Sequence, residues 1–190
     1  MNTTMVSLGQ LWLPIIVSAV VVFIASSVLH MVLTYHRADY RGLSNEDAVR
    51  AAINANRPAP GQYTIPYCAD PKEMASPEKV QKFNEGPVGI LTLRPTGTVK
   101  MSGFLGTWFI FLLVISYFTA YVLSRTIPLG APYLAVFRIA GTVAWMAYAG
   151  AEITNSIWRQ QPWVVTSKNV IDGLIYGLLT AGVFGWLWPR

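Results

Sequence analysis

Residues 11–35 read LWLPIIVSAVVVFIASSVLHMVLTY and contain no Asp, Glu, Lys or Arg. A transmembrane helix needs about 20 mostly apolar residues, so this stretch alone predicts a membrane protein. Three further stretches, 104–124, 131–154 and 170–188, are also long and apolar enough to cross a bilayer. We therefore expect an all-α membrane protein with four transmembrane helices in a bundle.

The composition of the chain agrees with this class. Of its 190 residues, 53% are hydrophobic and only 12% are charged, about half of the roughly 25% that is usual for soluble domains. Intrinsic disorder is excluded because it needs low hydrophobicity and high charge, and the single Cys68 excludes a disulfide scaffold. The net charge is +5, but no basic helix or arginine stripe accompanies it. We expect basic loops near anionic headgroups and no nucleic-acid partner.

The chain is expected to have three parts. Residues 1–35 hold the N-terminus and the first transmembrane helix, residues 36–103 form a polar insert, and residues 104–190 hold the other three helices. The first helix is not interpreted as a signal peptide, because residues 1–10 lack Lys and Arg and no small-residue cleavage site follows the apolar run.

The insert between the first two helices is predicted to be a small α+β extramembrane cap. Ser44 is expected to cap a helix that stops near Asn56, because Pro58 disfavours helical backbone before it. A second helix opens at Pro77 and ends at Gly86. The insert is too small for an independent core, so we expect it to lean on the bilayer or on a partner. Two stretches rich in β-formers are predicted as strands, 62–67 and 88–93.

Basic residues predict the orientation of the chain. Four helices place both termini on one side, where Arg125 and Arg190 are the only basic residues. The insert and the last loop lie on the other side, and the excess of basic residues there predicts that this side is cytoplasmic. The seven basic residues near the helix ends on that side are Arg37, Arg41, Arg50, Arg94, Lys100, Arg159 and Lys168.

Small residues recur along one face of the fourth helix. A spacing of four places them on one side, which predicts close packing against another helix, because backbone contact drives association in lipid. The alternative is a groove for a pigment, a quinone or a lipid tail. These residues are Gly173, Gly177, Ala181 and Gly185.

The first helix carries Ser18, Ser26 and His30 on a shared face. These groups either bond across the bundle or form a polar track that ends in an imidazole, which could relay protons or ligate a metal or a chlorin. His36 does not share that face. Two histidines without a spaced carboxylate are a weak metal pattern, so we expect no metal site.

Several charged residues fall within or beside the predicted helices. Arg138 is the deepest, and we expect its side chain to reach the near headgroups. Glu152 ends the third predicted helix, and Asp172 begins the fourth, where the helix dipole favours an acid. We expect at least one of these acids to contact a basic group or a helix N-terminus. The candidate cluster at the insert side comprises His30, Glu152, Arg159, Lys168 and Asp172, and its alternative is a set of interfacial charges without a task.

The chain contains no phosphate loop, HExxH, CxxC pair or GxSxG elbow, so we expect no cofactor. Several motifs nevertheless stand out. They are Trp12-Leu-Pro-Ile15, Ser26-Ser-Val-Leu-His30-Met31, Asp39-Tyr-Arg41, Asn45-Glu-Asp-Ala-Val49, Pro60-Gly-Gln-Tyr63, Glu85-Gly-Pro-Val88, Ser156-Ile-Trp158, Pro162-Trp163, Asp172-Gly-Leu-Ile-Tyr176 and Gly185-Trp-Leu-Trp-Pro189. Together these motifs resemble a family of small four-helix bacterial integral membrane proteins of unknown function. The resemblance implies a location in the bacterial inner membrane and no particular activity.

Three functions are compatible with these observations. The first is a non-catalytic accessory or structural subunit of a larger bacterial membrane complex, such as a respiratory or photosynthetic one, with the lipid bilayer and other membrane subunits as partners. The second is a small transporter or proton-relay protein that uses His30, Glu152 and Asp172. The third is a membrane enzyme that acts on a lipid or a quinone.

Overall fold

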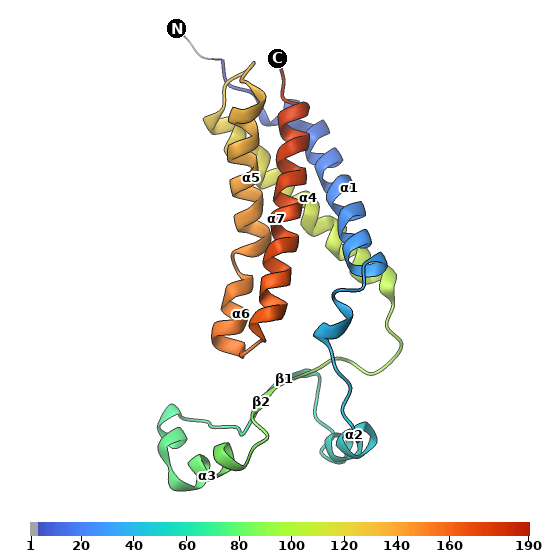
Figure 1. The fold of residues 1–190 in the computed structure, drawn as a ribbon, viewed down its shortest axis with the longest axis vertical. Helices are drawn as coiled ribbons and strands as arrows, with labels where there is room; N and C mark the ends of the chain where they lie inside the picture. Colours follow the sequence, from blue (N-terminus) through green and yellow to red (C-terminus); the bar gives the residue numbers. More distant parts are fainter. Residues whose placement is uncertain (1–3) are drawn as a thin grey trace. The chain divides into compact units, whose positions relative to one another are not determined.

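The computed structural model describes residues 4–190, which form two compact units (Figure 1). One unit comprises the described residues up to Asp39 together with Lys100–Arg190, and the other is Tyr40–Val99. Residues 36–39, which we expected in the insert, therefore belong to the helical unit. This short segment contains His36 and Asp39.

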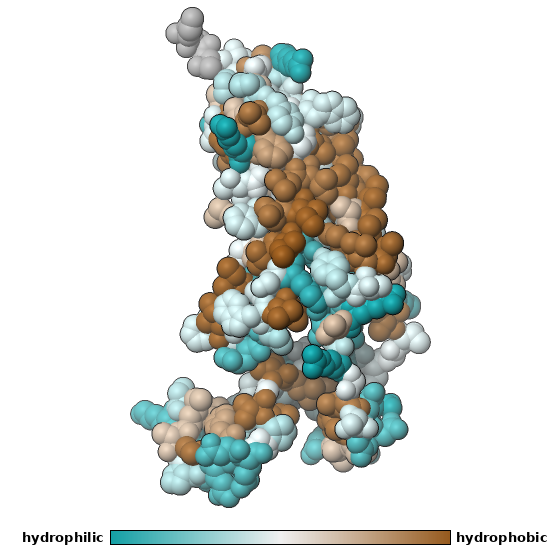
Figure 2. All heavy atoms as spheres, viewed as in Figure 1, coloured by the Kyte–Doolittle hydropathy of each residue, from teal (hydrophilic) through white to brown (hydrophobic). Residues whose placement is uncertain are grey.

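The helical unit contains four helices that are long and apolar enough to cross a membrane. Their outer surfaces expose large hydrophobic side chains, and Figure 2 shows a broad hydrophobic area over these helices. The fourth span is the most enclosed by its neighbours. The spans are Leu8–Val32, Met101–Thr126, Tyr133–Arg159 and Trp163–Trp186.

Two of the spans are built from more than one element. The first joins a 3₁₀ turn (Leu8–Leu11), α1 (Trp12–Ser27) and a π-helical turn (Val28–Val32). The third joins α5 (Tyr133–Ala149) and α6 (Glu152–Arg159), whereas α4 (Met101–Thr126) and α7 (Trp163–Trp186) are single helices.

The predicted third and fourth helices, 131–154 and 170–188, imply a loop over residues 155–169, and this prediction is wrong. Helix α6 continues to Arg159, and α7 begins at Trp163 directly after Pro162. Sequence reasoning missed this start because the first turns of α7 carry polar residues, which lower the hydropathy of the segment although they face inward. Thr166 is buried and its hydroxyl lies 2.6 Å from that of Ser156, which ties α6 to α7.

The small-residue face of α7 packs against α5, and the two helices lie side by side (Figure 1). A Cβ atom added at Gly177 would lie 3.0 Å from the backbone nitrogen of Trp145, and one added at Gly173 would lie 2.9 Å from the Cβ of Ala149. Gly141 on α5 provides the complementary space, where an added Cβ would lie 3.2 Å from the Cβ of Ala181. The contacts run antiparallel and leave no room for larger side chains.

Farther along the same face, Gly185 meets an aromatic ring. A Cβ atom added there would lie 2.6 Å from the Tyr133 ring at the start of α5. The expected face of Gly173, Gly177, Ala181 and Gly185 is therefore occupied by α5 along its length.

Small polar groups join α1 to α4. The hydroxyls of Ser18 and Ser116 lie 3.0 Å apart in the buried interior, and the Trp108 indole donates a hydrogen bond of 2.9 Å to the Ser26 hydroxyl. The prediction that Ser18 and Ser26 bond across the bundle is confirmed. Each hydroxyl is satisfied locally, and Ser26 in turn donates to the Phe23 carbonyl.

Three segments meet at one end of the helical unit (Figure 1). The Leu129 amide donates to the Thr4 carbonyl, and the Gly130 amide donates to the Pro189 carbonyl. The Trp188 indole also donates to the carbonyl of Pro128. The segment after Thr4, the α4–α5 turn and the C-terminal segment thus share one end of the helical unit.

The second unit, Tyr40–Val99, contains two α-helices, a 3₁₀ helix (Pro71–Ala75) and a two-stranded sheet. Helix α2 (Glu46–Ala55) is capped by Asn45 rather than Ser44, because the Asn45 side chain accepts the Ala48 amide. Helix α3 (Pro77–Glu85) is capped by Ser76 and ends before Gly86 as expected. Strands β1 (Gly61–Ile65) and β2 (Gly89–Leu93) pair antiparallel, with Tyr63 opposite Leu91.

Candidate functional site

A group of six polar side chains gathers where the segment after α1 meets α7. We call it the polar cluster. Three members come from the irregular chain that follows the first span, two come from α7, and one from the π-helical turn. The members are His30, Tyr35, His36, Asp39, Lys168 and Asp172.

The chain leaves the helical path after Val32, and the turn that follows brings its two histidines together. The helix widens into the π-helical turn, and Leu33 then adopts an extended backbone with φ −76° and ψ 140°. A short 3₁₀ turn at Arg37–Asp39 follows. As a result, the His36 ring stacks on the His30 ring with centroids 4.4 Å apart.

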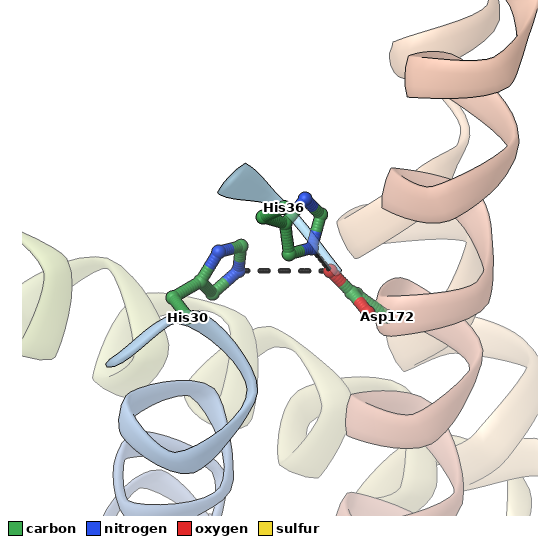
Figure 3. Close-up of side chains that lie close together, drawn as sticks. All are labelled: His30, His36 and Asp172. Atoms are coloured by element: carbon green, nitrogen blue, oxygen red, sulfur yellow. Dashed lines mark hydrogen bonds and ion pairs between the residues drawn. The ribbon is translucent and has the colours of Figure 1, made fainter. Parts of the chain in front are cut away.

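Asp172 is the centre of the cluster (Figure 3). Its Oδ2 atom lies 2.7 Å from His36 Nε2 and 3.6 Å from His30 Nε2, while its Oδ1 atom accepts a hydrogen bond from the Tyr35 hydroxyl. The Asp172 side chain is only 4% exposed. A buried carboxylate within a membrane-length helix is costly unless it is paired, and three neighbours supply that pairing.

Asp39 forms a second acidic centre beside the first. Its Oδ2 atom lies 2.6 Å from His36 Nδ1, and its Oδ1 atom accepts a hydrogen bond of 2.5 Å from Lys168 Nζ. Lys168 also donates to the backbone carbonyl of Tyr35 at 2.6 Å. Lys168 on α7 therefore holds the irregular segment by both its backbone and its side chain.

His36 has a carboxylate at each ring nitrogen. A neutral imidazole carries one N–H and can donate to only one of them, whereas an imidazolium can donate to both. Both contacts are therefore favourable together only if a hydrogen atom or a metal ion lies between His36 Nε2 and Asp172 Oδ2. Because the His36 side chain is only 13% exposed, water does not readily take that position.

Two groups of the segment after the first span have shifted pKa values. Burial raises the pKa of the Tyr35 phenol well above its ordinary value, and the hydrogen bond to Asp172 raises it further. Hydrogen bonds from Lys168 and then from His36 lower the pKa of the Asp39 carboxyl. At neutral pH, Tyr35 thus remains a hydrogen-bond donor and Asp39 an anionic acceptor.

The structure brings together three of the five residues of the expected cluster, His30, Lys168 and Asp172. Glu152 lies apart, where it accepts a hydrogen bond of 2.9 Å from the Asn169 side chain. Arg159 is exposed in the last turn of α6 and forms no ion pair within residues 4–190.

The helix positions expected for the two acids are wrong. Asp172 does not begin the fourth helix but lies nine residues after its start at Trp163, so the dipole of the helix N-terminus does not stabilise it. Glu152 does not end the third helix, because α5 stops at Ala149 and Glu152 opens α6. Arg138 is exposed on α5, and among the described residues no acid pairs with it.

Sequence reasoning missed Tyr35, His36 and Asp39. The first span was expected to remain helical to Tyr35, which would point His36 away from the face of His30. The end of the helical backbone at Val32 removes that restriction. The spacing of His36 and Asp39 by three residues, just beyond an apolar run, is the one signal in the sequence that could have identified this pair.

Comparison of the chain with protein-family models, with curated proteins and with solved structures finds no match. The resemblance to small bacterial membrane proteins therefore stays a prediction.

Proposed function

We propose that this protein is a non-catalytic subunit of a larger bacterial membrane complex, and that the unit Tyr40–Val99 docks onto another subunit. The observation that supports the proposal is that none of the residues from Tyr40 to Val99 is buried. A two-stranded sheet with two short helices has little stability on its own, so this unit needs a surface to cover its apolar side chains.

The apolar side chains of this unit are conspicuously accessible. Tyr40 is 92% exposed, Tyr67 67% and Leu43 61%. Helix α2 adds the exposed Val49 and the half-buried Ile53, which are spaced by four residues and share a face that Arg50 and Asn54 do not share. Exposed apolar side chains that gather on a surface mark an interaction site.

The charge of the unit favours a protein partner over the bilayer. Residues 40–99 contain seven basic and six acidic residues, so they lack the polybasic excess that attracts a segment to anionic headgroups. Balanced charge around apolar side chains is instead typical of a rim and core at a protein interface.

Site-specific photo-cross-linking tests the proposal. A photoreactive amino acid replaces Val49 on the apolar face of α2, and a matched variant carries it at Asn54 on the polar face of the same helix. Both full-length proteins are extracted in mild detergent, and native electrophoresis with mass spectrometry identifies the species attached. We expect the Val49 probe to join one membrane subunit that also co-migrates with the unmodified chain.

The same experiment separates the other functions. Equal labelling from Val49 and Asn54, or labelling of lipid alone, contradicts the docking proposal. A chain that migrates only as a homo-oligomer, and that moves protons or cations when reconstituted in vesicles, favours the small transporter or proton relay. A lipid or quinone retained beside the polar cluster and turned over there favours the membrane enzyme.

A further inference from the structure

We propose that His30, His36 and Asp172 bind one divalent first-row transition-metal ion, with Zn²⁺ as the ion of best fit. One ligand atom of each residue lies within 4.8 Å of the other two, and Figure 3 shows both imidazoles turned toward the carboxylate. This inference goes beyond the proposed function and does not depend on it.

The donor set selects the class of ion. Two imidazoles and one carboxylate suit Zn²⁺ and its neighbours, whereas Mg²⁺ and Ca²⁺ prefer oxygen ligands. Three protein ligands leave a fourth tetrahedral position for water or another ligand. The ion would link the end of the first span to the middle of α7, two segments far apart in the sequence.

The distances from Asp172 to the two imidazoles approach those of a tetrahedral site, and the two imidazole nitrogens lie within 4.8 Å of one another. Zn–N and Zn–O bonds of about 2.0–2.2 Å place neighbouring ligand atoms roughly 3.3–3.6 Å apart. His30 Nε2 already lies 3.6 Å from Asp172 Oδ2. His36 Nε2 lies 2.7 Å from the same oxygen, so this pair must separate by somewhat less than 1 Å. His36 can supply that movement because it lies outside the regular helices.

The residues that form hydrogen bonds to the proposed ligands are of the kind found around metal sites. A metal-bound histidine usually donates its other ring N–H to a carboxylate, which fixes the tautomer. Asp39 Oδ2 lies 2.6 Å from His36 Nδ1 and so directs the lone pair of Nε2 toward Asp172. Tyr35 binds the other oxygen of Asp172, which leaves Oδ2 free to face the two imidazoles.

The charge of the cluster also favours a cation. With both imidazoles neutral, Asp39 and Asp172 against the single Lys168 leave one net negative charge in a largely buried group. When Zn²⁺ binds, it replaces any proton that His36 Nε2 donates to Asp172, and that proton passes to solvent. The His30 side chain is 48% exposed, which provides a route for the ion.

Metal titration of the full-length protein tests the site. The protein is purified in detergent with an affinity tag that contains no histidine, stripped with chelator, and titrated with Zn²⁺ by calorimetry. Co²⁺ serves as a second probe, because its visible spectrum reports tetrahedral nitrogen and oxygen ligands. His30→Gln and His36→Gln remove one ligand each. Glu152→Gln serves as control, because it removes an acid at the start of α6 that lies outside the polar cluster.

We expect one Zn²⁺ per chain, at least tenfold weaker binding in each histidine variant, unchanged binding in Glu152→Gln, and no competition from Mg²⁺. The partly exposed His30 makes His30→Gln the decisive variant if His36→Gln does not fold. Binding of Zn²⁺ that is equally strong in wild type and His30→Gln, or no binding by folded wild type, overturns the proposal.

Discussion

His36 Nε2 lies 2.7 Å from Asp172 Oδ2, although 136 positions separate the two residues in the chain. This contact joins the irregular segment after the first span to the most enclosed helix of the protein. Lys168, one helical turn before Asp172, reinforces it by binding Asp39 and the Tyr35 carbonyl. The segment is therefore held by α7 at several points rather than acting as a free linker.

Asp39 is expected to stabilise the fold in a pH-dependent way. Its pKa is lowered below the usual 3.8 by Lys168 and His36, so its stabilisation is complete above that value and is lost as the pH falls through the folded-state pKa. We expect Asp39→Asn to lower the free energy of unfolding by about 1.5–3 kcal/mol at neutral pH. The difference from wild type should shrink below about pH 4.

Thermal unfolding in detergent with chelator present, at neutral and at acidic pH, measures this difference. Asp47→Asn is the matched control, because the Asp47 side chain is 94% exposed and forms an ion pair with the exposed Arg50. A loss of stability in Asp39→Asn that is the same at both pH values argues against an ionised Asp39 as its source.

Close packing of α7 on α5 predicts intolerance of any side chain at Gly177. The Cβ atom of Gly177→Ala would lie 3.0 Å from the Cβ and the backbone nitrogen of Trp145, so the helices must move apart. We expect a loss of about 1–3 kcal/mol in stability. Gly182→Ala on the same helix is the control, since its Cβ would meet only the Tyr133 hydroxyl at 3.8 Å. Equal stability of the two variants would contradict the packing described.

The excess of basic residues on the insert side predicts that Cys68 faces the cytoplasm. We expect a membrane-impermeant maleimide to label Cys68 only after the cells are permeabilised. In a Cys68→Ser background, Ser7→Cys near the N-terminus should be labelled in intact cells, because the N-terminal segment lies at the opposite end of the helical unit from the last helix–helix connection. The reverse pattern of labelling would invert the topology.

Much of the fold could be predicted because long apolar runs and capping residues are local signals. The four apolar helices, both helices of the insert and the pairing segments of its sheet follow from such signals. Boundaries were harder where polar residues lie inside a helix. The start of α7 at Trp163 was missed because Thr166, Lys168 and Asn169 find partners within the protein rather than in water.

The candidate site could be predicted only in part. His30, Lys168 and Asp172 were expected near one another from the depth of their positions in the predicted helices. The contribution of His36 depends on the end of the helical backbone at Val32, which no residue pattern in the apolar run indicates. Asp39 and Tyr35 enter the cluster through the same departure from the helix, so all three were missed together.

Measuring the coupling free energy between the His36 and Asp172 side chains tests the polar cluster most directly. A double-mutant cycle with His36→Gln, Asp172→Asn and the double variant, measured by unfolding in mixed detergent micelles, isolates the interaction of the two side chains. A second cycle with His36→Gln and Glu152→Gln serves as control. We predict a coupling free energy of about 0.5–3 kcal/mol for the first cycle and additive effects for the second. Additivity of His36→Gln and Asp172→Asn within about 0.3–0.5 kcal/mol would contradict the account, because the two side chains would then not share a site.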